Sequence, residues 1–365
     1  MNKKVLVYGA GAIGRGFLPW VFSPQKYEYY YVEINNNLRN LLNKNKKFIS
    51  FKARNNRYES VTVPVKYCFN LGEEKEKVRE VDFVITAVGP RNVLSIAENL
   101  KETTVPIICC ENDYSIPELI SSITNNPHVV FAIPDVITSN SAPSELKEKD
   151  PLAIVTEDGV CYIDKKVDWI GGEVTYVSKE ELRKQWLAKL YLHNTPHCIA
   201  AYLGNILSVK YLHEAMQNKM SEEIVRGAMN EMKCVLLRKF HLEKGFVGWY
   251  ANKELKRFKN TLLFDPIDRV AREPFRKLAP SERLIGAAQL CISCGIVPKN
   301  IILGIMAAFC YNNPSDADAN IKYLIEALEP KDFLKIAIRL HSSEALYELL
   351  LDEWKYNINK LRRLK

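Results

Sequence analysis

Apolar residues in the first half of the chain fall in short runs of strand length, most of them ending at glycine or a polar residue. The runs occupy residues 5–8, 27–32, 81–88, 106–110 and 129–133. Continuous apolar runs of this length, bounded by turn residues, are typical of strands buried on both faces of a sheet. We therefore expect residues 1–177 to form an α/β domain with a doubly wound sheet.

Two β-hairpins are also predicted in this domain. Each is a pair of apolar runs on either side of a polar turn: residues 48–51 with 60–65, and residues 152–156 with 160–163. The second hairpin is expected to close the domain before residue 178.

Helical periodicity replaces the strand pattern from Ser178 onward. Ser178-Lys-Glu-Glu181 has the form of a capping box, and apolar residues follow it at spacings of three and four. Further helices are predicted over residues 220–240, 280–294, 316–328 and 342–361. Residues 178–365 therefore predict an all-α second domain.

The composition is that of an ordinary globular protein, with 47% hydrophobic and 26% charged residues. A net charge of +8 suits an anionic small molecule, and it is too evenly spread along the chain to predict nucleic-acid binding. The most apolar stretches, residues 284–297 and 301–310, are each shorter than the roughly 20 residues that span a bilayer. With no signal-peptide pattern at the N-terminus, we expect a cytoplasmic protein that binds neither membrane nor nucleic acid.

The nine cysteines do not form the pattern of a disulfide scaffold in a chain this long. Most of them lie in apolar runs, where cysteine packs as a small hydrophobe. Cys291 and Cys294 have CxxC spacing, but without a second pair a buried helix is favoured over a metal or redox site. We expect a reducing compartment and no metal.

A glycine motif follows the first predicted strand. Gly9-Ala10-Gly11-Ala12-Ile13-Gly14 has the form Gly-x-Gly-x-x-Gly and leads into a helix predicted over residues 17–22. Gly9 permits a tight turn, Gly11 lets a pyrophosphate approach the backbone, and Gly14 lets helix and strand pack closely. The free N–H groups at the helix N-terminus favour the phosphates, so the motif predicts a Rossmann-type dinucleotide site.

Residues at the ends of later strands complete the predicted cofactor site. Glu33 lies near the spacing at which a carboxylate binds the ribose 2′-hydroxyl, which favours NAD; the alternative is an exposed strand-end residue. The backbone of Ala87, Val88 and Gly89 is expected beside the dinucleotide. Asn112 either orients the nicotinamide or a substrate hydroxyl, or is simply the end of a strand.

The segment from Lys189 to His197 places a lysine, an asparagine and two histidines in one predicted helix. Lys189, His193 and His197 recur at intervals of four and so share a helical face, with Asn194 beside them. Pro196 is expected to kink or restart the helix. In hydride transfer from an alcohol, a lysine of lowered pKa can accept the hydroxyl proton while amide and imidazole groups hold the oxygen. The alternative is an exposed lysine and two histidines satisfied by packing. Cofactor and substrate are expected to meet at this segment.

A basic run precedes the helix predicted from residue 280. Its candidate phosphate ligands are Arg272, Arg276, Lys277 and Arg283. Arginine binds phosphate through two parallel hydrogen bonds, and a helix N-terminus adds to that attraction. The alternative is a solvated surface run paired with Asp268, Glu273 and Glu282.

Together these motifs resemble the polyol-specific long-chain dehydrogenase/reductase family. The segments that carry the resemblance, in chain order, are residues 9–17, 86–90, 110–112, 189–204 and 269–285. The resemblance implies metal-independent hydride transfer to NAD, with Lys189 as general acid/base and Asn194 and His197 binding the reacting oxygen. In sugar-phosphate members of the family, mannitol 1-phosphate and NAD give fructose 6-phosphate and NADH.

The residues that we expect to bind the substrate are Arg15, Asn112, Asp135, His193, Arg272, Arg276, Lys277 and Arg283. The chain departs from the family at Val136, Pro196 and His193, where relatives carry arginine, glycine and an uncharged residue. A reductase of tagaturonate or fructuronate type, a dehydrogenase of unphosphorylated polyols, and a catalytically silent NAD sensor are the alternatives. The sequence leaves monomer and homodimer open.

Overall fold

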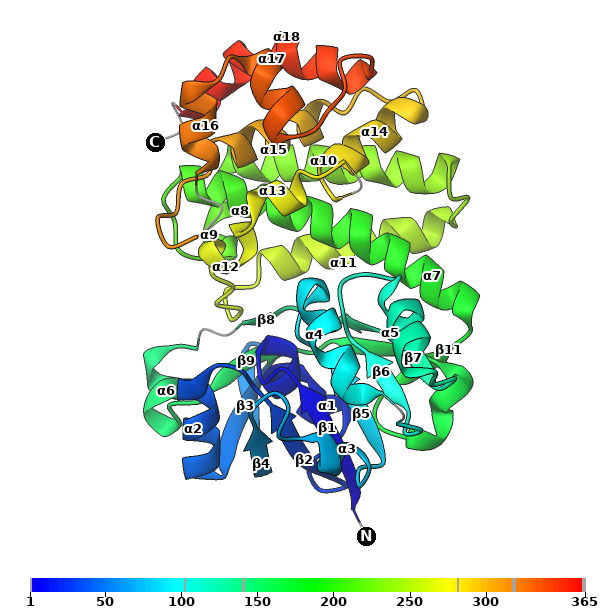
Figure 1. Cartoon of the computed structure of the whole chain (residues 1–365). Helices are drawn as coiled ribbons and strands as arrows, with labels where there is room; N and C mark the ends of the chain where they lie inside the picture. The colour runs from blue at the N-terminus through cyan, green and yellow to red at the C-terminus, as the bar shows by residue number, and fades with distance from the viewer. Residues whose placement is uncertain (1, 102, 140–141, 281, 317–319, 363–365) are drawn as a thin grey trace. The chain divides into compact units, whose positions relative to one another are not determined.

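The chain forms two compact units, Met1–Trp186 with Leu262–Phe264, and Leu187–Thr261 with Asp265–Lys365. The computed structural model describes residues 2–101, 103–139, 142–280, 282–316 and 320–362. In Figure 1 the chain colour runs from blue at the start of the first unit to red at the end of the second.

The first unit is built on a mixed sheet whose strand order, over the described residues, is β11-β10-β7-β6-β5-β1-β2-β4-β3-β9-β8. Its strands are β1 Lys3–Tyr8, β2 Tyr27–Val32, β3 Lys47–Arg54, β4 Arg57–Phe69, β5 Phe83–Thr86, β6 Ile107–Cys109, β7 Val129–Asp135, β8 Thr138–Ser139, β9 Ile154–Glu157, β10 Val160–Asp164 and β11 Thr175–Val177. The five strands predicted from apolar runs are all present, and they pair in parallel.

The sheet is covered on both faces, as a doubly wound fold requires. Val5 and Val7 of β1 belong to one apolar cluster, and Leu6 and Tyr8 belong to another. Since successive strand residues point to opposite faces, β1 is buried on both. The helical segments of this unit are η1 Ala12–Phe17, α1 Leu18–Val21, α2 Asn36–Asn45, α3 Lys75–Val78, η2 Pro90–Asn92, α4 Val93–Ala97, η3 Glu98–Leu100, α5 Ile116–Thr124, α6 Ser144–Lys149, η4 Lys165–Ile170 and α7 Lys179–Ala188.

The first predicted hairpin is confirmed, and the second is wrong. β3 and β4 pair antiparallel across the predicted turn. By contrast, β9 pairs in parallel with β3 and antiparallel with β8, while β10 pairs with β7 and β11. Every residue of β9 is buried, so this strand needs a neighbour on each side, and it finds both far from β10 in the sheet order. Long-range pairing therefore overrides the local turn signal.

In the described residues of the second unit, the regular secondary structure is helical, apart from one isolated β-bridge between Tyr211 and Pro266. Its segments are η5 Lys189–Asn194, α8 Thr195–Ile206, α9 Leu212–Ala215, α10 Lys219–Arg238, α11 Lys244–Phe258, α12 Ile267–Ala271, α13 Pro274–Lys277, α14 Ile285–Ser293, α15 Lys299–Phe309, α16 Ile321–Ala327, α17 Pro330–Asp332, η6 Phe333–Ala337 and α18 Ala345–Arg362. The central α8 packs against α10, α12 and α15. Ser281 and residues 317–319, which fall in two predicted helices, lie outside the described residues. Among the helices that are described, none has the length and apolarity to cross a bilayer.

The first compact unit continues through Trp186, past residue 178, where the second domain is predicted to begin. The predicted domain boundary stays a prediction. The backbone N–H of Glu181 donates to the Ser178 hydroxyl at 3.2 Å, so the predicted cap is present at the start of α7. Leu182 of α7 packs with Phe131, whose ring is also 5.4 Å from that of Trp186. These contacts place most of α7 with the first unit. The division of cofactor and substrate binding between the two parts of the chain stays a prediction.

The glycine loop gives a matched pair of substitutions. A Cβ at Gly14 would overlap the carbonyl oxygen of Gly9, whereas a Cβ at Gly11 would meet nothing within 4 Å. We expect Gly14→Ala to lower the free energy of unfolding by about 2 kcal/mol or more, because the overlap is with backbone. Gly11→Ala should change it by less than about 0.5 kcal/mol.

The same pair separates folding from cofactor binding. If a dinucleotide approaches the backbone at Gly11, Gly11→Ala should weaken its affinity at least roughly tenfold while the fold stays intact. Chemical denaturation and fluorescence titration with NADH measure the two quantities. Unchanged affinity in Gly11→Ala would reject the predicted approach.

Candidate active site

The cofactor residues predicted in the first unit lie at one edge of its sheet. Tyr8 is level with Val32 of β2 and with Thr86 of β5. The residues that follow these three positions are therefore brought together, as the Gly9 N–H bond to the Val32 carbonyl at 2.9 Å illustrates. The carboxyl edge of parallel strands is where α/β sheets bind ligands.

Glu33 is tied to the glycine loop. Its Oε2 accepts the N–H of Ala10 at 3.0 Å, and its Oε1 accepts the N–H of Asn35 at 2.8 Å. The carboxylate is therefore more than an exposed strand end, because it fixes where the loop from Gly9 to Gly14 begins. Ala12, Ile13 and Gly14 follow in the helical turn η1. Contact of Glu33 with a ribose stays a prediction.

Arg15 lies inside the first unit. Its side chain is only 7% exposed and donates to the carbonyls of Ala10 at 2.6 Å and Leu152 at 2.7 Å. Burial lowers the pKa of Arg15, and the nearby Glu33 acts against that shift. These contacts bind the glycine loop to the strand region around Leu152. The predicted substrate contact of Arg15 gains no support from them and stays a prediction.

Glu111 holds the second cofactor-side loop, a role that the sequence reasoning missed. Its carboxylate accepts the N–H groups of Val88 at 3.0 Å and Gly89 at 2.8 Å. Burial raises the pKa of Glu111, and the two N–H donors act against that shift. The sequence did contain a signal for this role, because Glu111 is an acidic residue directly after the apolar run of a predicted strand. Its neighbour Asn112, which was predicted to bind the cofactor or the substrate, is exposed. Asp135, the last residue of β7, is buried.

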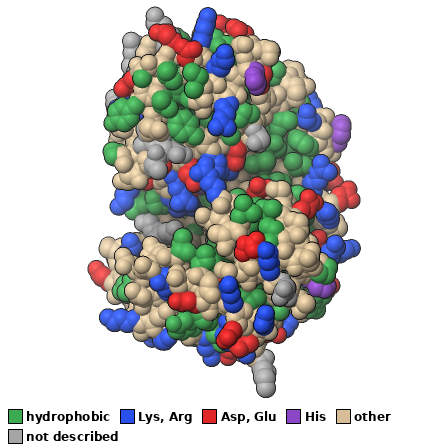
Figure 2. Space-filling view, in the orientation of Figure 1, with side chains coloured by type: hydrophobic (Ala, Val, Ile, Leu, Met, Phe, Trp, Pro, Cys, Tyr) green, Lys and Arg blue, Asp and Glu red, His purple; other side chains and the backbone are tan. Residues whose placement is uncertain are grey.

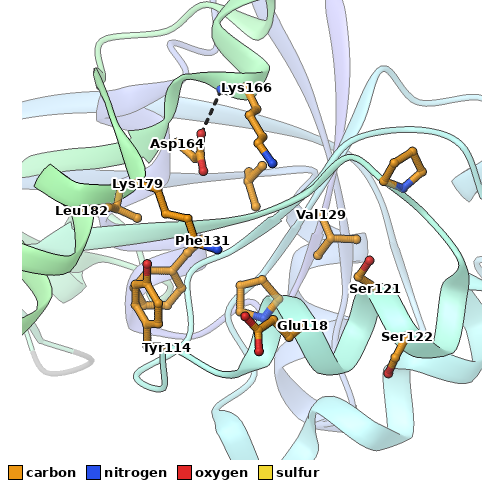
Figure 3. Close-up of a pocket in the computed structure, with 13 residues that line it drawn as sticks. Tyr114, Glu118, Ser121, Ser122, Val129, Phe131, Asp164, Lys166, Lys179 and Leu182 are labelled. Carbon is orange, nitrogen blue, oxygen red and sulfur yellow. Dashed lines mark hydrogen bonds between the residues drawn. The ribbon is translucent and has the colours of Figure 1, made fainter.

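A cavity of about 420 Å³ in the first unit is lined by none of the predicted site residues. Figure 3 shows Glu118 on α5 and Lys179 on α7 at its border. Among the described residues that line it, none carries a buried polar atom lacking a hydrogen-bond partner. We therefore do not assign it to the active site.

The helical hydrogen-bond pattern changes within the Lys189–His197 segment, while the backbone of Asn194 and Thr195 stays right-handed helical. The kink or restart expected at Pro196 stays a prediction. Residues 189–194 form the π-helical turn η5, and α8 begins at Thr195 with Pro196 in its first turn. Proline lacks the N–H that a continuous α-helix would need here. The prediction that Lys189 shares a helical face with His193 and His197 used a spacing of four residues, which applies to an α-helix. In the wider π-helical turn that spacing does not fix the direction of the Lys189 side chain. Lys189 is half-buried and Asn194 is buried.

His193 and His197 are brought together, each with a buried carboxylate. Their ring centroids are 4.7 Å apart. His193 Nδ1 lies 2.5 Å from Glu254 Oε2, and His197 Nε2 lies 2.9 Å from Asp265 Oδ2. Phe258 stacks on His197 with centroids 5.3 Å apart. Neither acid was among the predicted site residues, because both are far from the segment in sequence.

Glu254 already has a cationic partner besides His193. Arg257 Nη1 donates to Glu254 Oε1 at 2.6 Å, and Lys253 Nζ lies 3.4 Å from the same oxygen. A protonated His193 would therefore add an excess positive charge to a desolvated site. Burial lowers the pKa of His193 to about 4, against the attraction of Glu254.

The residues of the basic run are mostly paired inside the second unit. Arg276 donates to Glu273 at 2.8 Å, and Arg283 to Glu282 at 3.2 Å. Lys277 is 4% exposed, and its ammonium binds backbone carbonyls, that of Val270 at 2.7 Å. Arg272, between α12 and α13, is exposed. In the view of Figure 2, basic and acidic side chains are interspersed, in keeping with a diffuse charge.

The buried His193 makes stability depend on pH. An unfolded histidine gains a proton near pH 6.5, while folded His193 stays neutral down to about pH 4. The unfolded state therefore binds more protons in this window, and stability falls as the pH falls through it, by on the order of 3 kcal/mol from this residue. His193→Gln should remove that part of the acid destabilisation. Urea denaturation of both proteins at several pH values tests this; parallel pH profiles would contradict it.

The fold resembles solved dehydrogenase structures. The mannitol 2-dehydrogenase of Pseudomonas fluorescens, in ternary complex with NAD and D-mannitol, has a TM-score of 0.79 at 13% identity, covering 99% of this chain and 92% of that chain. A substrate-free D-sorbitol dehydrogenase has a TM-score of 0.64 at 12% identity, covering 99% and 95%. These structures confirm the predicted fold class, an α/β Rossmann-type domain followed by an all-α domain.

Sequence comparisons carry further than the fold. Mannitol-1-phosphate 5-dehydrogenase of Thermoanaerobacter pseudethanolicus is 30% identical over 87% of this chain and 88% of its own length. The protein of the same name from Clostridium acetobutylicum is 30% identical over 87% and 88%. The family model for the mannitol dehydrogenase Rossmann domain matches residues 3–170, and that for the mannitol dehydrogenase C-terminal domain matches residues 182–346. The chain therefore belongs to the mannitol dehydrogenase family, which confirms the resemblance seen in its motifs.

Proposed function

We propose that this protein is an NAD-dependent dehydrogenase that interconverts a polyol phosphate and a ketose phosphate, of the mannitol 1-phosphate and fructose 6-phosphate type. The names of its curated relatives support the substrate class, and the solved neighbour with NAD and D-mannitol supports the cofactor. The observation that carries the phosphate part is the grouping of the buried Lys277 with Arg276 and Arg283, whose charges add to burial in lowering the pKa of Lys277.

The charge around Lys277 suits an anion. Burial, together with repulsion from Arg283 and Arg276, lowers the pKa of Lys277 to about 7. A bound anion would relieve that repulsion and favour the charged ammonium. Since Lys277 donates to backbone carbonyls, its part is to hold the chain between α12 and α13. Arg272 and Arg276, which are less buried, are the better candidates for direct contact.

The groups around α8 supply the proton chemistry. In the oxidation, Lys189 in its neutral form takes the proton of the substrate hydroxyl, while the hydride leaves the carbon that bears this hydroxyl. Asn194 and His197 hold the oxygen while it becomes a carbonyl. In the reverse direction, Lys189 returns the proton to that oxygen. Bound NAD serves as the hydride acceptor.

A substrate panel tests the proposal. We expect purified protein to oxidise NADH with fructose 6-phosphate, much faster than with fructose, tagaturonate or fructuronate, and faster than it oxidises NADPH. Absorbance at the NADH band measures each rate. Activity confined to fructose or to a uronate would replace the phosphate assignment with one of the alternative substrates. A protein that binds NADH but reduces none of the four would be a sensor.

Lys189 can be tested against a lysine nearby. Lys189→Ala should lower kcat by roughly 10²–10⁴-fold, the usual contribution of a general acid/base, while NADH affinity is retained. Lys184→Ala is the control, because Lys184 pairs on the surface of α7 with Glu181. It should stay within about twofold of the unmodified enzyme. A Lys189→Ala variant within tenfold of the unmodified enzyme would exclude the lysine as the base.

A further inference from the structure

Asp265 joins the two segments of the predicted site within the second unit. Its side chain is 2% exposed, and its Oδ2 lies 2.9 Å from Nε2 of His197. Its Oδ1 accepts the Nε–H of Arg269 at 3.0 Å and a further N–H of the same guanidinium. One carboxylate thus contacts a predicted catalytic residue and Arg269, the first residue of the segment 269–285 that carries the family resemblance.

The position of Asp265 is fixed by its surroundings. Its carbonyl accepts the N–H of Leu212 at 3.0 Å, and Pro266 bridges to Tyr211. The next residue, Ile267, begins α12, the helix that packs against α8. A carboxylate held in this way aims at His197 with little freedom, so the direction of the imidazole is set by the fold.

The charge of Asp265 decides which nitrogen of His197 carries a proton. Burial would raise the pKa of Asp265, but Arg269 and His197 outweigh it and lower the pKa to about 2. An ionised carboxylate can only accept hydrogen bonds. His197 must therefore donate from Nε2, and in the neutral ring Nδ1 remains as an acceptor.

We propose that Asp265 is a positioning residue that holds His197 in its Nε2–H tautomer, leaves Nδ1 for a substrate oxygen, and aligns Arg269 beside it. This rests on the proposed function for the identity of the substrate. A neutral Nδ1 accepts a hydrogen bond from a polyol hydroxyl.

The tautomer can be measured without a substrate. Two-bond ¹H–¹⁵N correlation spectra of protein with ¹⁵N-labelled histidines, at mildly alkaline pH, report the protonation of each ring nitrogen. The His197 signals are those lost in His197→Asn. We expect a protonated Nε2 and a bare Nδ1. An Nδ1–H tautomer, or a ring protonated on both nitrogens, would overturn the proposal.

Substitution of Asp265 tests the consequence for activity. In Asp265→Asn we expect the preference for the Nε2–H tautomer to weaken and kcat to fall about 10²-fold, as for an acid–base group that has lost its orientation. Asp268→Asn is the control, because Asp268 is an exposed acid in the first turn of α12. It should keep both the tautomer and the rate.

The outcomes separate the two proposals. An Asp265→Asn enzyme that folds, retains the tautomer and turns over at the unmodified rate would reject the positioning role. If the variant does not fold, the spectra of the unmodified protein still decide the tautomer. An unmodified protein inactive with every substrate of the panel would reject the proposed function, whatever the tautomer of His197.

Discussion

The cost of burying charge is the constraint on which the second unit depends. Glu254, Asp265 and Lys277 are all buried, and even the most exposed of them, Lys277, is only 4% exposed. An unpaired charge in such places would cost several kcal/mol, so each must meet a partner or lose its charge. Glu254 meets Arg257, Asp265 meets Arg269, and Lys277 meets backbone carbonyls. His193 and His197 therefore contact carboxylates whose negative charges are already paired with an arginine.

The first unit meets a related constraint with carboxylates that bind backbone. Glu33 accepts an N–H of the glycine loop, and Glu111 accepts two N–H groups of the loop after β5. Buried N–H groups need acceptors, and these loops leave theirs at the carboxyl edge of the sheet. The acids therefore shape the edge on which the dinucleotide is proposed to bind, and their substitution would disturb the loops as well as any ligand.

Local pattern predicted the elements of the fold, but it did not predict their long-range partners. The apolar run of β1 and the glycines after it were informative because both faces of that strand are buried. The pairing of β9 with β3 depends on contacts about a hundred residues away, and no turn signal encodes it. For the same reason Lys189, Asn194 and His197 could be singled out by type and spacing, whereas Glu254 and Asp265 could not. A carboxylate more than 60 residues further along the chain carries no local mark of the histidine it meets.

His193 and His197 each contact a buried carboxylate, but they do so through different ring nitrogens. Glu254 takes Nδ1 of His193, whereas Asp265 takes Nε2 of His197. The two rings, tilted with centroids 4.7 Å apart, are therefore engaged by these carboxylates through different nitrogens, which leaves Nε2 of His193 and Nδ1 of His197 for other partners. Since the family resemblance puts an uncharged residue in place of His193, the added ring brings a neutral acceptor beside the proposed oxygen-binding group without adding charge.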